Sequence, residues 1–242
     1  MRAVPDRFDV LAMAMGAGGA GAVSGEGPPL LGLDTHARLV GAYQWIERRL
    51  FEVVGSWTLS EPVPEARIVF DLYSQQHAWH AELFAERLPA LDQVDPDTLT
   101  VPPSVEVDRV LSTLAGELPA GGAGVEGEGE PAVSATPRPG TGLPAGGTLL
   151  RLVGLGRAVL PRLVAGYGLH LQRSATVADA PVRRCLRLVL GDEIEQWQAI
   201  EALTQSLLRR PHDVAVVSAH QQHLEELLAE TGVGLVPWPD RP

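Results

Sequence analysis

Apolar residues recur at every third or fourth position in several stretches of the chain, which is the spacing of helices with one buried face. The first helix is predicted over residues 34–57, with Asp34 or Thr35 as its N-cap. The second is predicted over residues 64–88, because a proline opens it and another proline follows it. A short helix is expected over residues 104–118. Three helices are therefore predicted between residues 34 and 118.

The helical pattern stops after residue 118 and resumes near residue 148. Further helices are predicted over residues 148–176, 179–209 and 213–230. Glycines and Pro161 weaken the first of these, so a kink or break is expected near Leu160. Its core row is Leu160, Val164, Tyr167 and Leu171, with His170 close by. Asp179 is the expected N-cap of the next helix.

These helices predict an all-α fold, an antiparallel four-helix bundle made of two helical pairs. Accessory short helices and a long disordered linker complete it. The predicted parts are a disordered leader (1–32), a first helical pair with a short helix (33–118), a flexible Gly/Pro-rich linker (119–147), a second helical pair with a C-terminal helix (148–232) and a tail (233–242). The two helical segments are expected to form one domain, because the linker separates them without requiring adjacent helix ends.

Charge and composition narrow the function classes. The formal net charge of −11 opposes binding to a phosphate backbone, so no nucleic-acid partner is expected. The longest apolar runs are too short to cross a membrane, and acidic residues interrupt the basic part that a signal peptide would need. A cytoplasmic protein is expected. Every basic residue is an arginine, which is typical of a high-GC genome and predicts a bacterial source.

Polar residues interrupt the apolar faces at mid-length. Glu47 falls on the apolar stripe of the first helix and Glu193 on that of the helix 179–209. Glu47 points either into the core or, through its long side chain, back to solvent at the edge of the stripe; the sequence leaves both open. The buried face of the second helix is predicted as Val69, Leu72, Tyr73, Gln76, Trp79, His80, Leu83 and Phe84, with His77 beside it.

Two helical pairs with such polar breaks resemble the ferritin-like carboxylate bundles, which hold two metal ions between four helices. That family has one Glu on each of two helices and a Glu-x-x-His pair on each of the others, because residues three apart share a helix face. The phrase Asp192-Glu-Ile-Glu-Gln-Trp197 is similar to a fourth helix of this family. The resemblance covers residues 34–90 and 148–210 and implies the bundle fold.

The family's ligands carry over only in part. Glu47 fits the single Glu of the first helix. Ser74-Gln-Gln-His77 has the spacing of the pair but Ser in place of Glu, and Glu193-Ile-Glu-Gln196 has Gln in place of His. The third helix offers Tyr167 and His170 at the level of its missing Glu. The resemblance therefore implies a reduced or remodelled metal site.

A different ligand set is available for a single ion. His77-Ala-Trp-His80 places two imidazoles on one face, and Glu47 and Glu193 add two carboxylates, a donor set suited to Zn²⁺, Fe²⁺ or Mn²⁺. Alternatively, these side chains are hydrogen-bonded without metal, with Gln76 and Gln196 satisfying polar groups across the bundle. The sequence leaves both readings open.

Two functions follow from these readings. The first is a non-redox binding or assembly protein without a cofactor, acting as a homodimer, in which the polar residues form a buried network. The second is an iron- or manganese-dependent oxidase or hydroxylase acting on an unidentified small organic substrate. In the second, Glu47, His77 and Glu193 bind the metal, and Tyr167 or His170 lies near the reactive pocket.

Other motifs carry less chemistry. Gly16-x-Gly18-x-x-Gly21 matches a dinucleotide-binding fingerprint, but no strand–helix–strand context follows it. Cys185 is expected to be a buried thiol. His220 and His223 lie three apart on the last predicted helix, without an acidic partner at i−3 or i+4, and are expected to be solvated.

Overall fold

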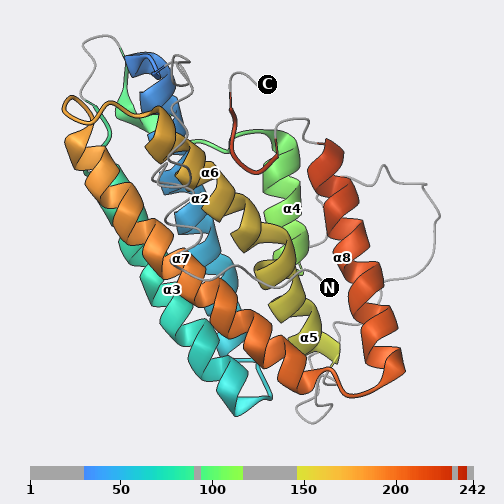
Figure 1. Cartoon of the computed structure of the whole chain (residues 1–242). Coiled ribbons are helices and arrows are strands. Elements are labelled where there is room, and N and C mark those ends of the chain that lie inside the picture. The colour runs from blue at the N-terminus through green and yellow to red at the C-terminus, as the bar shows by residue number, and fades with distance from the viewer. Residues whose placement is uncertain (1–29, 90–93, 117–145, 231–233, 239–242) are drawn as a thin grey trace, which may run out of the picture.

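The computed structural model describes residues 30–89, 94–116, 146–230 and 234–238, and helices dominate these ranges (Figure 1). The α-helices are α2 (Leu33–Thr58), α3 (Pro64–Ala85), α4 (Val105–Ala115), α5 (Gly146–Val153), α6 (Leu160–Arg173), α7 (Ala180–Leu207) and α8 (Pro211–Glu230). A 3-10 turn spans Pro96–Thr98, and a π-helical turn, Gly154–Val159, joins α5 to α6. The predicted all-α class is confirmed. Most of the predicted leader, linker and tail, and the glycine motif, lie outside the described residues.

Helix α2 buries the stripe that its sequence pattern predicts. Its core residues are Leu39, Val40, Tyr43, Ile46, Leu50, Val53, Val54 and Trp57. Each fully buried aliphatic side chain contributes about 1.5–3 kcal/mol to folding. The predicted N-cap is wrong, because Gly32 occupies that position and makes no side-chain cap. Asp34 lies inside the first turn, where a carboxylate favours the positive end of the helix, and accepts a hydrogen bond from Arg38.

The predicted buried face of α3 is partly wrong. Leu72 and Trp79 are 50% and 45% exposed. Val69, Gln76 and Leu83 are half-buried. The core face consists of Ala66, Phe70, Tyr73, Ser74, His77, His80 and Phe84. Apolar residues lie on both sides of this helix, so hydrophobic spacing did not fix its rotation about its own axis.

The predicted irregularity near Leu160 takes the form of the π-helical turn. Pro161 lacks an N–H and its ring would clash with the carbonyl four residues earlier; a wider turn immediately before it relieves both problems. Two glycines in this turn permit close packing. A Cβ on Gly154 would lie 2.4 Å from Leu114 Cδ1, and one on Gly156 would lie 2.5 Å from Ile200 Cγ2.

The N-cap predicted for α4 is confirmed, whereas the one predicted for α7 makes no cap hydrogen bond. Ser104 caps α4 as predicted, its hydroxyl accepting from the N–H of Val107 at 3.2 Å. Asp179 occupies the N-cap position of α7 but makes no cap hydrogen bond there. Its carboxylate instead accepts from the N–H of Ala175 at 2.7 Å, in the loop before the helix.

The helices enclose one main core (Figure 1). Helix α2 packs along α3, α6 along α7, and α3 against α7, while α4 and α8 pack against each other beside them. Side chains of α6 also reach α2 through this core. No helix among the described residues is both long and apolar enough to cross a membrane. The cytoplasmic location and the homodimer stay predictions.

A buried ion pair fixes the start of α5 to the connection between α2 and α3. Glu61 is fully buried, and its carboxylate accepts from Arg151 at 3.0 Å and from the hydroxyl of Thr148. The same carboxylate accepts from the N–H of Val63 at 3.1 Å, and Arg151 also donates to the Ser60 hydroxyl at 2.9 Å. These hydrogen bonds join α5 to residues that lie almost ninety positions or more earlier in the sequence.

Candidate metal centre

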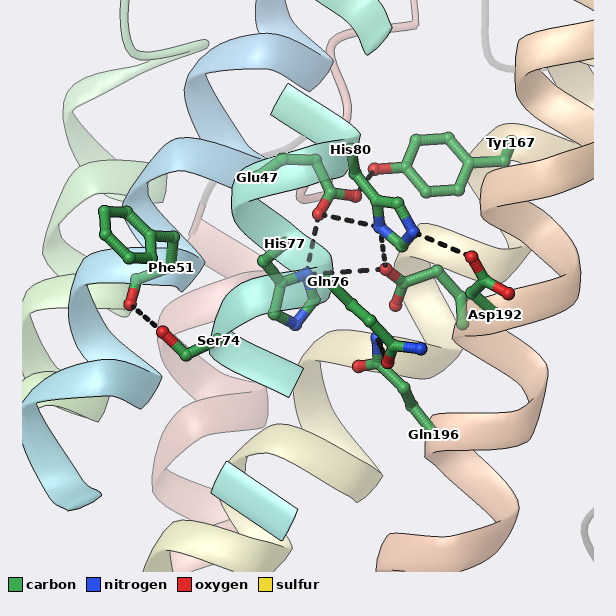
Figure 2. Close-up of polar contacts among 10 residues, drawn as sticks. Glu47, Phe51, Ser74, Gln76, His77, His80, Tyr167, Asp192 and Gln196 are labelled. Carbon is green, nitrogen blue, oxygen red and sulfur yellow. Dashed lines mark hydrogen bonds and ion pairs between the residues drawn. The ribbon is translucent and has the colours of Figure 1, made fainter. Parts of the chain in front are cut away.

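Four ionisable side chains from three helices meet in the core. Glu47 on α2, His77 and His80 on α3, and Glu193 on α7 are each fully buried. One ligand atom from each lies within 4.8 Å of the others. Figure 2 shows Glu47, His77 and His80 pointing toward one another. The structure thus brings together the four residues that the sequence predicted as ligands of a single ion. Of the two orientations open for Glu47, the core orientation is the one observed.

The geometry of the cluster centres on the two Nδ1 atoms. His77 Nδ1 lies 2.6 Å from Glu47 Oε2 and 3.5 Å from Glu193 Oε1. His80 Nδ1 lies 3.4 Å and 3.2 Å from the same two oxygens. Both imidazoles therefore present the same nitrogen to the same pair of carboxylates. His80 Nε2 points the other way and lies 3.2 Å from Asp192 Oδ2.

Several atoms at the centre of this cluster are left without hydrogen bonds. His80 Nδ1 and both carboxylate oxygens of Glu193 have no hydrogen-bond partner within the described part of the chain. The 3.2 Å approach between them is an ion-pair distance without hydrogen-bond geometry. An unsatisfied buried polar group costs about 1–3 kcal/mol, and more when it is charged. A cation at the centre would satisfy these atoms together.

The cluster perturbs its own ionisation. Burial alone would raise the pKa of Glu47, but the attraction and hydrogen bond of His77, together with His80, outweigh it and lower that pKa to about 2. Burial and the neighbouring Glu47 raise the pKa of Glu193. Burial would lower the pKa of His80, but the carboxylates of Asp192, Glu193 and Glu47 raise it to about 12. Glu47 is therefore the more acidic of the two carboxyl groups, Glu47 and Glu193.

Tyr167 on α6 supports Glu47 from the opposite side. Its hydroxyl is buried and donates to Glu47 Oε1, as Figure 2 shows. Burial, and then the nearby carboxylates, raise the pKa of Tyr167 well above its ordinary value, so the phenol stays protonated. The hydrogen bond occupies one oxygen of Glu47 and leaves Oε2 facing the histidines. Tyr167 thus orients a candidate ligand.

Comparison with known proteins does not assign the chain to a family. No family model matches the chain, and neither a curated protein nor a solved structure matches it. The ferritin-like resemblance stays a prediction.

Of the pair Ser74 and His77, only His77 belongs to the cluster. The Ser74 hydroxyl donates to the carbonyl of Phe51 at 3.0 Å, away from the carboxylates (Figure 2). Ser74 also packs against α2 closely enough that a Cβ on Gly55 would lie 2.7 Å from its hydroxyl. The histidine pair at positions 77 and 80 occupies the level that the resemblance assigned to residues 74 and 77.

Gln76 and Gln196 join α3 to α7 next to the cluster. Gln196 Nε2 donates to Gln76 Oε1 at 3.1 Å (Figure 2). Gln196 is almost fully buried, and its Oε1 has no hydrogen-bond partner among the residues described; the same holds for His77 Nε2. The two glutamines thus bond to each other between α3 and α7.

His170 lies in a separate polar chain. Its Nδ1 is 3.2 Å from the Tyr43 hydroxyl and its Nε2 is 3.0 Å from His36 Nδ1. Burial, and to a lesser degree His36, lower the pKa of His170 to about 3. The Tyr43 ring packs edge-on against that of Tyr167 at 4.7 Å between centroids. His170 is therefore a neutral neighbour of the site and is not among the converging ligands.

Replacing His170 with asparagine is expected to flatten the acid side of the stability curve. The unfolded state binds a proton near pH 6.5 and the folded state only near pH 3, so stability falls as pH falls between these values. The expected loss in the parent is about 1.4 kcal/mol per pH unit, or about 2 kcal/mol from pH 6.5 to pH 5. Urea unfolding over that range measures it. An unchanged slope in His170→Asn, or an equal change in the exposed-residue control His223→Asn, would contradict the assignment.

Sequence reasoning missed Asp192, Tyr43 and His36. Asp192 lies just outside the apolar stripe of α7, and its proximity to His80 depends on how α3 and α7 pack. The stripe of α2 included Tyr43 as an apolar residue, although a buried phenol needs a partner for its hydroxyl. That requirement was the available signal.

The remaining candidates stay outside the site. Cys185 is buried as expected, and burial raises the pKa of its thiol to about 11, which disfavours a reactive thiolate. His223 is exposed as expected, whereas His220 is half-buried on α8.

Proposed function

We propose that the protein binds one divalent transition-metal ion between Glu47, His77, His80 and Glu193. The supporting observation is the convergence of His80 Nδ1 and the Glu193 carboxylate, buried and without hydrogen bonds, on Glu47 Oε2 and His77 Nδ1. Two imidazoles and two carboxylates suit Zn²⁺, Fe²⁺ or Mn²⁺.

The scaffold in this proposal is a ferritin-like antiparallel bundle of α2, α3, α5–α6 and α7. The long helices and the positions of Glu47 and Glu193 support it. The bundle would hold one ion in place of two. Tyr167 occupies the second oxygen of Glu47, and Gln196 offers an amide where the family has an imidazole.

A structural or sequestering role for the ion is favoured over catalysis. Four protein side chains are available to fill a tetrahedral shell, whereas catalytic sites leave a position open. The alternative, an iron- or manganese-dependent oxidase or hydroxylase, needs such an open position. Fe²⁺-loaded protein that consumes O₂ would favour that alternative.

Metal analysis of protein purified without chelators is expected to show one equivalent of a single transition metal. His77→Gln and Glu193→Gln keep the side-chain size and are expected to lose it. His223→Gln, which changes an exposed histidine on α8, is expected to retain it. Circular dichroism checks that each variant is folded. Metal-free protein titrated with Zn²⁺ to about a thousand times its Kd should gain about 4 kcal/mol of stability. A folded parent that neither contains metal nor gains stability with Zn²⁺, Fe²⁺ or Mn²⁺ would overturn the proposal.

A further inference from the structure

Asp192 is a carboxylate outside the four converging side chains, and it contacts one of them. Its Oδ2 lies 3.2 Å from His80 Nε2, and its side chain is 29% exposed while that of His80 is fully buried. Figure 2 shows the imidazole of His80 between Asp192 on one side and the carboxylate of Glu47 on the other. Glu193 Oε1 lies 3.2 Å from His80 Nδ1, on the side of Glu47.

We propose that Asp192 is a positioning residue for the metal site, whose carboxylate holds the N–H of His80 on Nε2 and directs Nδ1 toward the ion. This inference rests on the proposed metal-binding function and deepens it. It assigns to Asp192 a role in ligand orientation, without direct contact with the metal.

When His80 binds an ion through Nδ1, the ion replaces the proton on that nitrogen and the ring is neutral. The chemistry of this neutral imidazole supports the assignment. Such a ring carries one N–H, so one nitrogen donates and the other accepts or binds metal. With the proton on Nε2, His80 donates to Asp192 and its Nδ1 lone pair faces Glu47 Oε2 and Glu193 Oε1. With the proton on Nδ1, a lone pair on Nε2 would face a carboxylate oxygen at 3.2 Å, which is repulsive. Asp192 therefore selects the metal-binding tautomer.

The helix geometry explains how neighbouring carboxylates serve different purposes. Consecutive residues of an α-helix point about 100° apart. Glu193 consequently points into the core from α7, while Asp192 points sideways along the contact between α7 and α3, where His80 lies. The two acidic residues are adjacent in sequence but reach opposite sides of one imidazole.

The second histidine lacks this support. His77 Nε2 has no hydrogen-bond partner in the described ranges, and its ring is oriented through Nδ1 by Glu47 at 2.6 Å. The two imidazoles are thus held asymmetrically. Removing the Asp192 carboxylate should affect His80 and leave His77 largely unchanged, an asymmetry that a general loss of helix packing would not produce.

The test is a Zn²⁺ titration of Asp192→Ala and Asp192→Asn beside the parent. Alanine favours the helix and the position is partly exposed, so both variants should fold, as circular dichroism will check. Asp192→Ala is expected to raise the Kd for Zn²⁺ by about 10–100-fold. Asp192→Asn retains an oxygen that can accept from Nε2, so its Kd should lie between those of the parent and the alanine variant. Asp71→Ala removes an exposed carboxylate on α3 and should leave the Kd unchanged.

Nitrogen-15 chemical shifts of the histidine rings in the Zn²⁺-loaded proteins provide the second readout. In the parent, both histidines should show metal-bound Nδ1 and protonated Nε2. In Asp192→Ala, the His80 signals should depart from this state while those of His77 keep it. A parent that binds no Zn²⁺ would overturn the proposed metal site itself. A parent that binds Zn²⁺, with Asp192→Ala binding equally well and with the same His80 signals, would overturn only the role of Asp192.

Discussion

Replacing Glu47 with leucine is expected to lower the free energy of unfolding of the metal-free protein by about 3–5 kcal/mol. The substitution removes the anion next to His77 and His80, which are both fully buried. Three carboxylates raise the pKa of His80 to about 12, so its imidazolium would lose one of them and remain in the core. Tyr167 would also lose the acceptor of its hydroxyl. Denaturant unfolding in the presence of a chelator measures the loss.

Replacing the four buried ionisable side chains and Tyr167 together is expected to have the opposite effect on the free energy of unfolding. The variant carries leucine at positions 47, 77, 80 and 193 and phenylalanine at 167. Apolar replacement of buried ionic side chains is often neutral or stabilising by about 1–4 kcal/mol. None of the four fully buried ionisable groups is left to desolvate, and Asp192, which loses its contact with His80, is 29% exposed and is hydrated. This variant should be at least as stable as the metal-free parent and should bind no Zn²⁺. Such a result would show that the cluster lowers the stability of the metal-free protein. This is expected of side chains whose role is to bind an ion.

A loss of defined structure in the multiple variant would favour the other reading, in which the polar network fixes the helix register. Its markers would be broadened NMR signals and a reduced dependence of stability on denaturant. Glu82→Leu is the control for adding a leucine to this region. Glu82 is exposed on α3, so its replacement should change stability by no more than about 0.5 kcal/mol.

The sequence predicted the helices well because each carries local information. The apolar stripe of α2 follows from the spacing along one helix, whereas this spacing left the direction of Glu47 open. Pro161 and the glycines before it located the π-helical turn within a few residues. The proximity of His77 and His80 also followed from their spacing of three residues.

Contacts between helices were less accessible from the sequence. Leu72 and Trp79 suggested a rotation of α3 that the structure does not have, because an apolar residue can lie exposed at little cost whereas a buried charge needs partners. Ser74, which the resemblance placed where the family has Glu, donates to the carbonyl of Phe51. Asp192 needed the packing of α7 on α3, which no periodicity within one helix contains.

Replacing Glu61 with alanine is the second change with a large expected effect, a loss of about 3–5 kcal/mol in the free energy of unfolding. Glu61 is fully buried, and the substitution would leave Arg151, whose side chain is only 18% exposed, without its carboxylate. The Thr148 hydroxyl and the N–H of Val63 would lose the same acceptor. Thermal and denaturant unfolding measure the effect. Glu65→Ala, at an exposed position in the first turn of α3, is the matched control and should stay within about 0.5 kcal/mol.

The Zn²⁺ affinity of Glu61→Ala shows whether Glu61 stabilises only its own surroundings or also holds the two helical segments together. The ion pair between Glu61 and Arg151 joins α5 to the connection between α2 and α3. Helix α5 leads through the π-helical turn into α6, which carries Tyr167. If Glu61 ties the second helical segment to the first, its loss should weaken Zn²⁺ binding together with stability, although Glu61 is not a ligand. Equal Zn²⁺ affinity in parent and variant would limit Glu61 to a local stabilising role.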